Sequence, residues 1–144
     1  TVRSENLDGA IAMQGHQAVR DKMNNIKQKQ SVHEATAKDE AEFQTLQIVN
    51  EMMARKIEFL PVDIYKSEAK MFKVEDGKIR LPFSSLPGVG GAAADSLAET
   101  GKHTEYLSIE DMQIKTKVTK AVIETLKDVG VLKDLPESSQ MSLF

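Results

Sequence analysis

The chain has 144 residues, 40% of them hydrophobic, and a net charge of −3, which suits one domain or one and a half with a buried core. It contains no cysteine, which excludes disulfides and thiolate metal sites, and no apolar run long enough to span a membrane. The negative charge argues against a general nucleic-acid-binding surface, so any DNA contact has to be local. No signal peptide is recognisable and the chain begins in mid-element, so we expect a cytoplasmic piece of a larger protein.

Two helices are expected in the first third of the chain. Apolar residues recur at spacings of three and four from His16 to about Gln28, which predicts a helix. A polar loop over 30–34 follows. Thr36 and Asp39 then have the spacing of a capping box, and the helix behind them is predicted to run to about Arg55.

The middle of the chain favours extended structure. Residues 57–64 are apolar and broken by Pro61, which is typical of a connector or an edge strand. The polar residues 65–70 indicate a turn. Met71–Val74 and Lys78–Leu81 then flank an Asp-Gly pair, which predicts a small β-hairpin.

The stretch from Leu86 to Leu97 predicts a tight turn that leads directly into a helix. Pro87 cannot continue a helix, and Gly88 and Gly90 allow the backbone to turn with no side chain in the way. The first N–H groups of the helix point outward and attract an anion such as phosphate. Apolar-Pro-Gly-apolar-Gly before a helix is typical of a helix-hairpin-helix DNA-binding element, whereas an ordinary corner between helices is the alternative.

A second copy of this pattern follows at an offset of 29 residues, which carries Gly88 onto Lys117. Apolar residues coincide at Val89 and Val118, at Ala94 and Ile123, and at Leu97 and Leu126. Ser108–Asp111 is expected to cap the helix that leads into the second hairpin, and Gly130 to end the helix that leads out. The repeat predicts two hairpins packed about a pseudo-two-fold axis.

Paired hairpins of this kind hold a duplex by its backbone across the minor groove without reading bases. The second hairpin lacks the glycines, so Thr119 is expected to cap its helix while Lys117 and Lys120 supply charge. Lys102, just past the first hairpin, is a further expected contact. The expected DNA-binding residues are Gly88, Val89, Gly90, Gly91, Ala92, Lys102, Lys117, Thr119 and Lys120.

The chain ends on a polar tether, Pro136–Ser139, followed by a short segment with two large apolar residues. Burial of Leu143 and Phe144 in a pocket of a partner is worth about 1.5–3 kcal/mol each before ordering costs. A tail that folds back on its own domain is the alternative. The expected partner-binding residues are Gln140, Met141, Ser142, Leu143 and Phe144.

This ending resembles the bacterial sliding-clamp-binding peptide, Gln-Leu-Ser/Asp-Leu-Phe, with Met141 in place of the usual leucine. Asp63–Ala69, the Pro-Gly-Val-Gly hairpin and Leu135–Phe144 lie in the order and spacing of the C-terminal end of PolC-type DNA polymerase III. Glu51–Arg55 also resembles a helix of that family. The resemblance covers essentially the whole chain.

The resemblance implies a bacterial replicative DNA polymerase, a nucleotidyltransferase, whose catalytic aspartates hold two Mg²⁺ well upstream. This segment carries no catalytic or metal-ligating residue that we recognise. Its implied partners are the primer–template duplex, the sliding clamp (β subunit) and the upstream domains, and its implied location is the bacterial cytoplasm at the nucleoid. Turns such as Gly88–Gly90 can present carbonyls to a monovalent cation.

We therefore expect a mainly α fold with a small β-hairpin, in which a paired helix-hairpin-helix domain follows a helical segment from the fingers region. The expected parts are helices over 1–59, a connector and β-hairpin over 60–82, the paired hairpins over 83–135, and a flexible clamp-binding tail over 136–144. A repair or recombination protein with the same hairpins, or an interaction domain that does not bind DNA, are the alternatives. A free-standing enzyme lacks support, because the three histidines are scattered along the chain.

Overall fold

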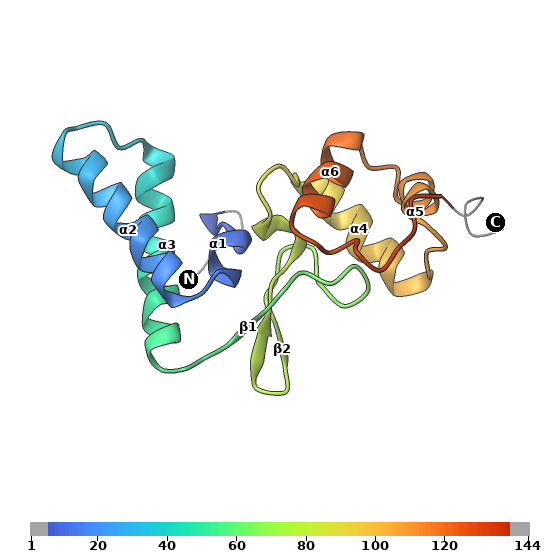
Figure 1. Cartoon of the computed structure of the whole chain (residues 1–144), viewed down its shortest axis with the longest axis horizontal. Helices are drawn as coiled ribbons and strands as arrows, with labels where there is room; N and C mark the ends of the chain where they lie inside the picture. Colours follow the sequence, from blue (N-terminus) through green and yellow to red (C-terminus); the bar gives the residue numbers. More distant parts are fainter. Residues whose placement is uncertain (1–5, 139–144) are drawn as a thin grey trace.

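The structure, a computed structural model, describes residues 6–138. Figure 1 shows α2 and α3 side by side at one end, a small sheet in the middle and α4, α5 and α6 at the other end. The mainly helical architecture with one small sheet confirms the predicted fold class. None of the helices within residues 6–138 is long and apolar enough to cross a membrane. The elements in chain order are α1 (Gly9–Met13), α2 (His16–Ser31), α3 (Ala37–Ala54), β1 (Phe59–Leu60), β2 (Lys73–Glu75), β3 (Lys78–Arg80), the 3₁₀ turn η2 (Phe83–Ser85), α4 (Gly91–His103), α5 (Ile109–Thr116) and α6 (Lys120–Asp128).

Local hydrogen bonds explain where the N-terminal helices begin and end. Thr36 Oγ1 accepts from the backbone N–H of Asp39 at 3.1 Å, and the Asp39 carboxylate accepts from the N–H of Thr36 at 3.0 Å, which confirms the predicted capping box. The second of these hydrogen bonds lowers the pKa of Asp39. Helix α2 continues to Ser31, into the predicted loop, because Gln and Lys are good helix formers and the left-handed backbone comes only at His33.

The predicted β-hairpin is present, and a third strand pairs with it to form a small sheet. Strands β2 and β3 pair antiparallel with Val74 opposite Ile79, and Asp76 and Gly77 turn the chain at φ values of +51° and +78°. Two positive φ angles at the centre of a two-residue loop match the twist of the strands. Residues 57–64, predicted as a connector or an edge strand, contribute the edge strand β1, which pairs parallel with β3, so the sheet has the order β1-β3-β2.

A turn is present at Asp63–Ser67, slightly earlier than the predicted 65–70, and it ties the sheet to the C-terminal helices. The Asp63 carboxylate accepts from the N–H of Tyr65 at 2.8 Å, and buried Ser67 Oγ donates to the carbonyl of Leu81 at 2.7 Å. The ring of Tyr65 stacks on Tyr106 with centroids 5.6 Å apart, and its hydroxyl accepts from the Tyr106 N–H at 3.2 Å. The turn therefore fixes the connection between α4 and α5.

Two glycines mark places where backbone segments touch. A Cβ at Gly101 of α4 would lie 2.2 Å from the carbonyl oxygen of Ile64, and one at Gly9 of α1 would lie 2.6 Å from Ser85 Oγ. No side chain fits at these distances. Gly101 therefore lets α4 pack directly on the Asp63–Ser67 turn, and Gly9 lets α1 pack on η2.

A single cluster of buried apolar residues runs through the described part of the chain, from α1 to the residues after α6. Leu46 of α3, Phe83 of η2, Leu97 of α4 and Met112 of α5 are each fully enclosed. Leu132 is also buried, so the residues after α6 close the fold. The two ends of the molecule thus share a continuous core, which fixes the hairpins relative to α2 and α3.

Candidate nucleic-acid interface

Hairpin 1 consists of η2, the turn Leu86–Gly90 and α4. The N–H of Val89 donates to the carbonyl of Leu86 at 3.2 Å, and the Val89 side chain is buried, which anchors the turn. Gly88 has a φ of +89°, a value that favours glycine. Gly90 is the N-cap of α4 and provides no side-chain hydrogen bond to the helix. The first N–H groups of α4 therefore lie at an exposed surface formed by Gly88, Gly90, Gly91 and Ala92.

Hairpin 2 consists of α5, the turn Lys117–Thr119 and α6. Lys117 ends α5 in the left-handed conformation with a φ of +61°. Val118 is buried, and Thr119 Oγ1 accepts from the N–H of Val122 at 3.4 Å, so Thr119 caps α6 as predicted. Lys117 and Lys120 are exposed, and neither has an ion pair among residues 6–138. Their charges are thus available to a ligand.

The backbone confirms the predicted repeat at its offset of 29 residues. Gly88 and Lys117 are both left-handed, and the valines that follow them are both buried. The next residues, Gly90 and Thr119, are both N-caps, with φ and ψ of −74° and 171° in the first and −76° and 163° in the second. The two turns have the same shape and differ in their side chains.

The two hairpins also contact each other reciprocally. Ser96 Oγ on α4 donates to the carbonyl of Thr116, directly before the turn of hairpin 2. Thr125 on α6, the residue 29 positions after Ser96, packs against the turn of hairpin 1, since a Cβ at Gly88 would lie 3.3 Å from its Oγ1. Equivalent hydroxyl side chains therefore meet the opposite turns, as a pseudo-two-fold arrangement requires.

Lys102 does not join the other predicted contacts. It lies at the C-terminal end of α4, about 16 Å along the helix axis from Gly91 at 1.5 Å per residue. Its ammonium pairs with the Glu68 carboxylate at 2.9 Å, and this hydrogen bond raises the pKa of Lys102. In this position Lys102 links α4 to the segment that follows the Asp63–Ser67 turn, and it does not add positive charge to the surface of either hairpin turn.

One lysine that the sequence analysis did not consider lies beside hairpin 1. Lys70 Nζ is 3.5 Å from the position that a Cβ of Gly91 would occupy. The residues are far apart in the sequence, and the fold alone brings them together. No local pattern around Lys70 identifies it, because its segment reads as an ordinary polar turn.

A cleft of about 430 Å³ separates the turn of hairpin 1 from α2 and α3. Lys22 and Lys38 line it together with Asp8, Asp39 and Glu42. Burial raises the pKa of Glu42. Lysines and acids are thus mixed in this cleft.

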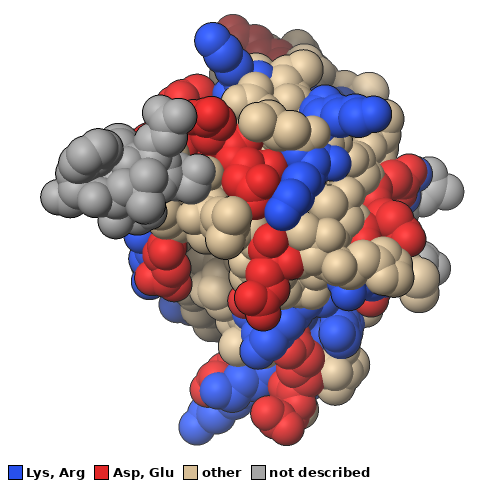
Figure 2. Space-filling view, turned by 90° about the vertical axis from the view of Figure 1, so that its right-hand side faces the viewer, with Lys and Arg blue, Asp and Glu red and all other residues tan. Residues whose placement is uncertain are grey.

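The surface at the hairpin end of the molecule mixes both signs of charge. Figure 2 shows lysine and arginine side chains interspersed with aspartate and glutamate over the face that it presents. Among residues 6–138 no group of three or more histidines, aspartates and glutamates is placed to hold a metal ion. A nucleic-acid contact here depends on the two turns and not on a broad basic field.

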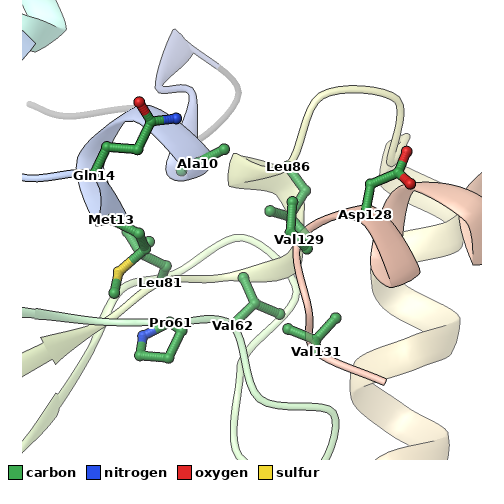
Figure 3. A pocket seen from close by; sticks show the side chains of 11 residues that line it. Ala10, Met13, Gln14, Pro61, Val62, Leu81, Leu86, Asp128, Val129 and Val131 are labelled. Carbon is green, nitrogen blue, oxygen red and sulfur yellow. The ribbon is translucent and has the colours of Figure 1, made fainter. Parts of the chain in front are cut away.

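An apolar cavity of about 230 Å³ adjoins the base of hairpin 1, where Leu86 is among the residues that line it (Figure 3). Its other lining residues come from α1, the segment after β1, the residue after β3, and the end of α6 with the residues that follow it. Gln14 and Asp128 supply its polar side chains, and the others, such as Met13, Val62 and Val131, are apolar. One carboxylate without a partner acid or base in the lining does not make an acid–base site.

The predicted clamp-binding residues Gln140–Phe144 lie outside the described part of the chain. The structure does describe the segment before them. The carbonyls of Pro136 and Glu137 accept from the N–H groups of Ile109 and Glu110 at 2.8 and 3.1 Å. The Glu137 carboxylate also pairs with Lys127 at 3.1 Å. The first two residues of the expected flexible tail are therefore held against hairpin 2.

Comparison with known proteins agrees with this geometry. The family model of the helix-hairpin-helix motif matches residues 56–141. Over all 144 residues, the chain is 40% identical to the PolC-type DNA polymerase III of Clostridium perfringens, 39% to that of Halalkalibacterium halodurans and 35% to that of Thermotoga maritima. The chain spans 10% of the length of each of these relatives. The resemblance seen in the sequence is thereby confirmed over the whole chain.

Proposed function

The chain belongs to the helix-hairpin-helix family, and we propose that it holds double-stranded DNA by its phosphate backbone, without reading sequence, as the duplex-binding part of a PolC-type replicative polymerase. The observation that carries this proposal is the pair of equivalent turns. Each turn presents the exposed N-terminus of a helix. The two turns are equivalent in the internal repeat, and equivalent side chains of the two hairpins also make the contacts between them.

The two turns are suited to phosphate in different ways. In hairpin 1 the helix N–H groups have no side-chain cap and glycines leave the backbone open, so a phosphate oxygen can approach the main chain closely. In hairpin 2 the hydroxyl of Thr119 already accepts from the helix, and Lys117 and Lys120 provide positive charge instead. We propose that each turn holds one strand across the minor groove.

We further propose a place for each part of the chain in the polymerase, supported by the similarity of the whole chain to PolC-type polymerases. We assign residues 1–59 to the end of the fingers region or the start of the duplex-binding region, 60–82 to a connector, 83–135 to duplex binding and 136–144 to a tail. Nucleotide transfer with Mg²⁺ belongs to upstream domains of the parent protein, in the bacterial cytoplasm. A monovalent cation at the Gly88–Gly90 turn would be held by main-chain carbonyls, since the turn carries no acidic or imidazole side chain.

We also propose that Gln140–Phe144 binds the sliding clamp. Support comes from the sequence of the segment, which keeps the glutamine and the terminal Leu-Phe of clamp-binding peptides. When one molecule binds both the duplex and the clamp weakly, the first contact raises the effective concentration of the second partner at its binding site. Such a pair would keep the polymerase on its template during synthesis.

Binding to a fluorescent duplex at a series of salt concentrations tests the DNA-binding role. We expect the logarithm of the binding constant to fall with the logarithm of the salt concentration, with a slope of about −3 for some three phosphates neutralised. Two duplexes of unrelated sequence should bind equally. Absence of binding at the lowest salt concentration, or a strong preference for one sequence, would contradict the proposal.

A further inference from the structure

The C-terminal tail leaves the molecule at a fixed point. Pro136 and Glu137 accept hydrogen bonds from Ile109 and Glu110, the first two residues of α5, and Glu137 pairs with Lys127 of α6. The N–H groups at the start of a helix have no partners inside it, so these carbonyls occupy positions that would otherwise take water. The tail therefore starts from the N-terminal end of α5.

The distance from this point to the clamp-binding segment is short. Gln140 follows Glu137 by three residues, so their Cα atoms lie at most about 11 Å apart even in a fully extended chain. Phe144, four residues further, can lie at most about 25 Å from Glu137 by the same measure. A globular protein that holds Gln140–Phe144 must consequently stand close to the start of α5.

Two large apolar side chains are exposed at this place. Leu107, directly before the cap of α5, is 69% exposed, and Ile114 on α5 is 68% exposed. Both lie around Asp111, whose carboxylate accepts from the Leu107 N–H at 2.9 Å and which precedes Ile114 by one helical turn. They are the exposed large hydrophobic residues within 83–138, while the other such residues of the described chain lie in the N-terminal helices, the connector and the β-hairpin.

We propose that Leu107 and Ile114 form a second docking contact for the protein that binds the Gln140–Phe144 segment. The inference rests on the proposed clamp-binding role of that segment. The short link from Glu137 brings the bound partner to α5, and burial of two apolar side chains against it adds affinity that the segment alone does not have. The partner would then be oriented relative to hairpin 2 and so relative to the duplex.

The test compares the affinities of the 144-residue chain and a peptide of residues 136–144 for the sliding clamp. We expect the chain to bind about ten-fold more tightly than the peptide. The double substitution Leu107→Ser/Ile114→Ser should reduce the chain to the affinity of the peptide. Met71→Ser/Val74→Ser is the matched control, because those residues are 73% and 74% exposed on the connector and β-hairpin, and it should leave the affinity unchanged.

Equal affinities of chain and peptide would overturn the second contact, as would a double variant that binds like the unsubstituted chain. Failure of the peptide itself to bind, or retention of peptide affinity after Phe144→Ala, would instead overturn the clamp-binding role of the tail. Both apolar residues are exposed, so thermal unfolding of the double variant should match that of the unsubstituted chain. The two failures are therefore distinguishable.

Discussion

Replacing Gly101 with alanine should lower the free energy of unfolding by about 3 kcal/mol or more, because the new methyl group would lie 2.2 Å from the carbonyl oxygen of Ile64. The obstacle is backbone, held by the hydrogen bonds of the Asp63–Ser67 turn, so it cannot move aside as a flexible side chain would. Alanine is otherwise favoured over glycine within a helix by about 0.5–1 kcal/mol, which offsets only part of the clash. Chemical denaturation measures the difference.

The substitution Gly91→Ala is the matched control, in the same helix. A Cβ there would lie 3.5 Å from the flexible end of Lys70, which is ordinary contact, so stability should be unchanged or slightly higher. Equal effects of the two substitutions would show that α4 does not pack on the Asp63–Ser67 turn as described. Such a result would also remove the support that the turn gives to the connection between the hairpins.

Replacing Lys117 with glycine should raise stability and weaken duplex binding at the same time. A lysine at a φ of +61° carries a strain of about 1 kcal/mol that glycine relieves, so the free energy of unfolding should rise by about 0.5–1 kcal/mol. Loss of one phosphate contact should weaken binding severalfold and make the salt slope shallower by about 1. Denaturation and duplex titration on the same protein measure both effects.

The chain provides a control in Lys56, which is also exposed, left-handed at a φ of +65° and a single positive charge. It follows α3, which lies across the sheet from α6 in Figure 1. Lys56→Gly should give a similar gain in stability with no change in the salt slope. If both substitutions weaken binding equally, the contribution of Lys117 is one of net charge and hairpin 2 is not a specific contact.

Much of the fold could be predicted because its signals are local. The capping box at Thr36, the Asp76-Gly77 turn, the cap at Thr119 and the end of α6 before Gly130 each depend on hydrogen bonds or φ angles within a few residues. The internal repeat was also recognisable, because equivalent turns need equivalent apolar anchors such as Val89 and Val118. These features confirm that the hairpin geometry is encoded in the sequence of each turn.

Other features depend on contacts between distant segments, which no local pattern of residues specifies. Residues 57–64 were consistent with an edge strand, which β1 is, but its parallel pairing with β3 depends on the tertiary fold. The nearness of Lys102 to hairpin 1 in the sequence predicts a DNA contact, yet the length of α4 carries this residue to the far end of the helix. Lys70 and Pro136 are distant from the hairpin turns in the sequence but close to the hairpins in space. Tertiary packing alone brings Lys70 to Gly91 and Pro136 to the start of α5, so the sequence does not predict either contact.

The most direct measurement of the central claim, that hairpin 1 holds phosphate with its backbone, is duplex binding by Gly90→Thr. Thr119 adopts the same backbone conformation at the equivalent position, and nothing lies within 4 Å of a Cβ at Gly90, so the substitution fits and adds a helix cap. We expect unchanged or higher stability and about ten-fold weaker binding, because the new hydroxyl and methyl group occupy the place of the phosphate. Unchanged affinity in a folded variant would contradict the claim.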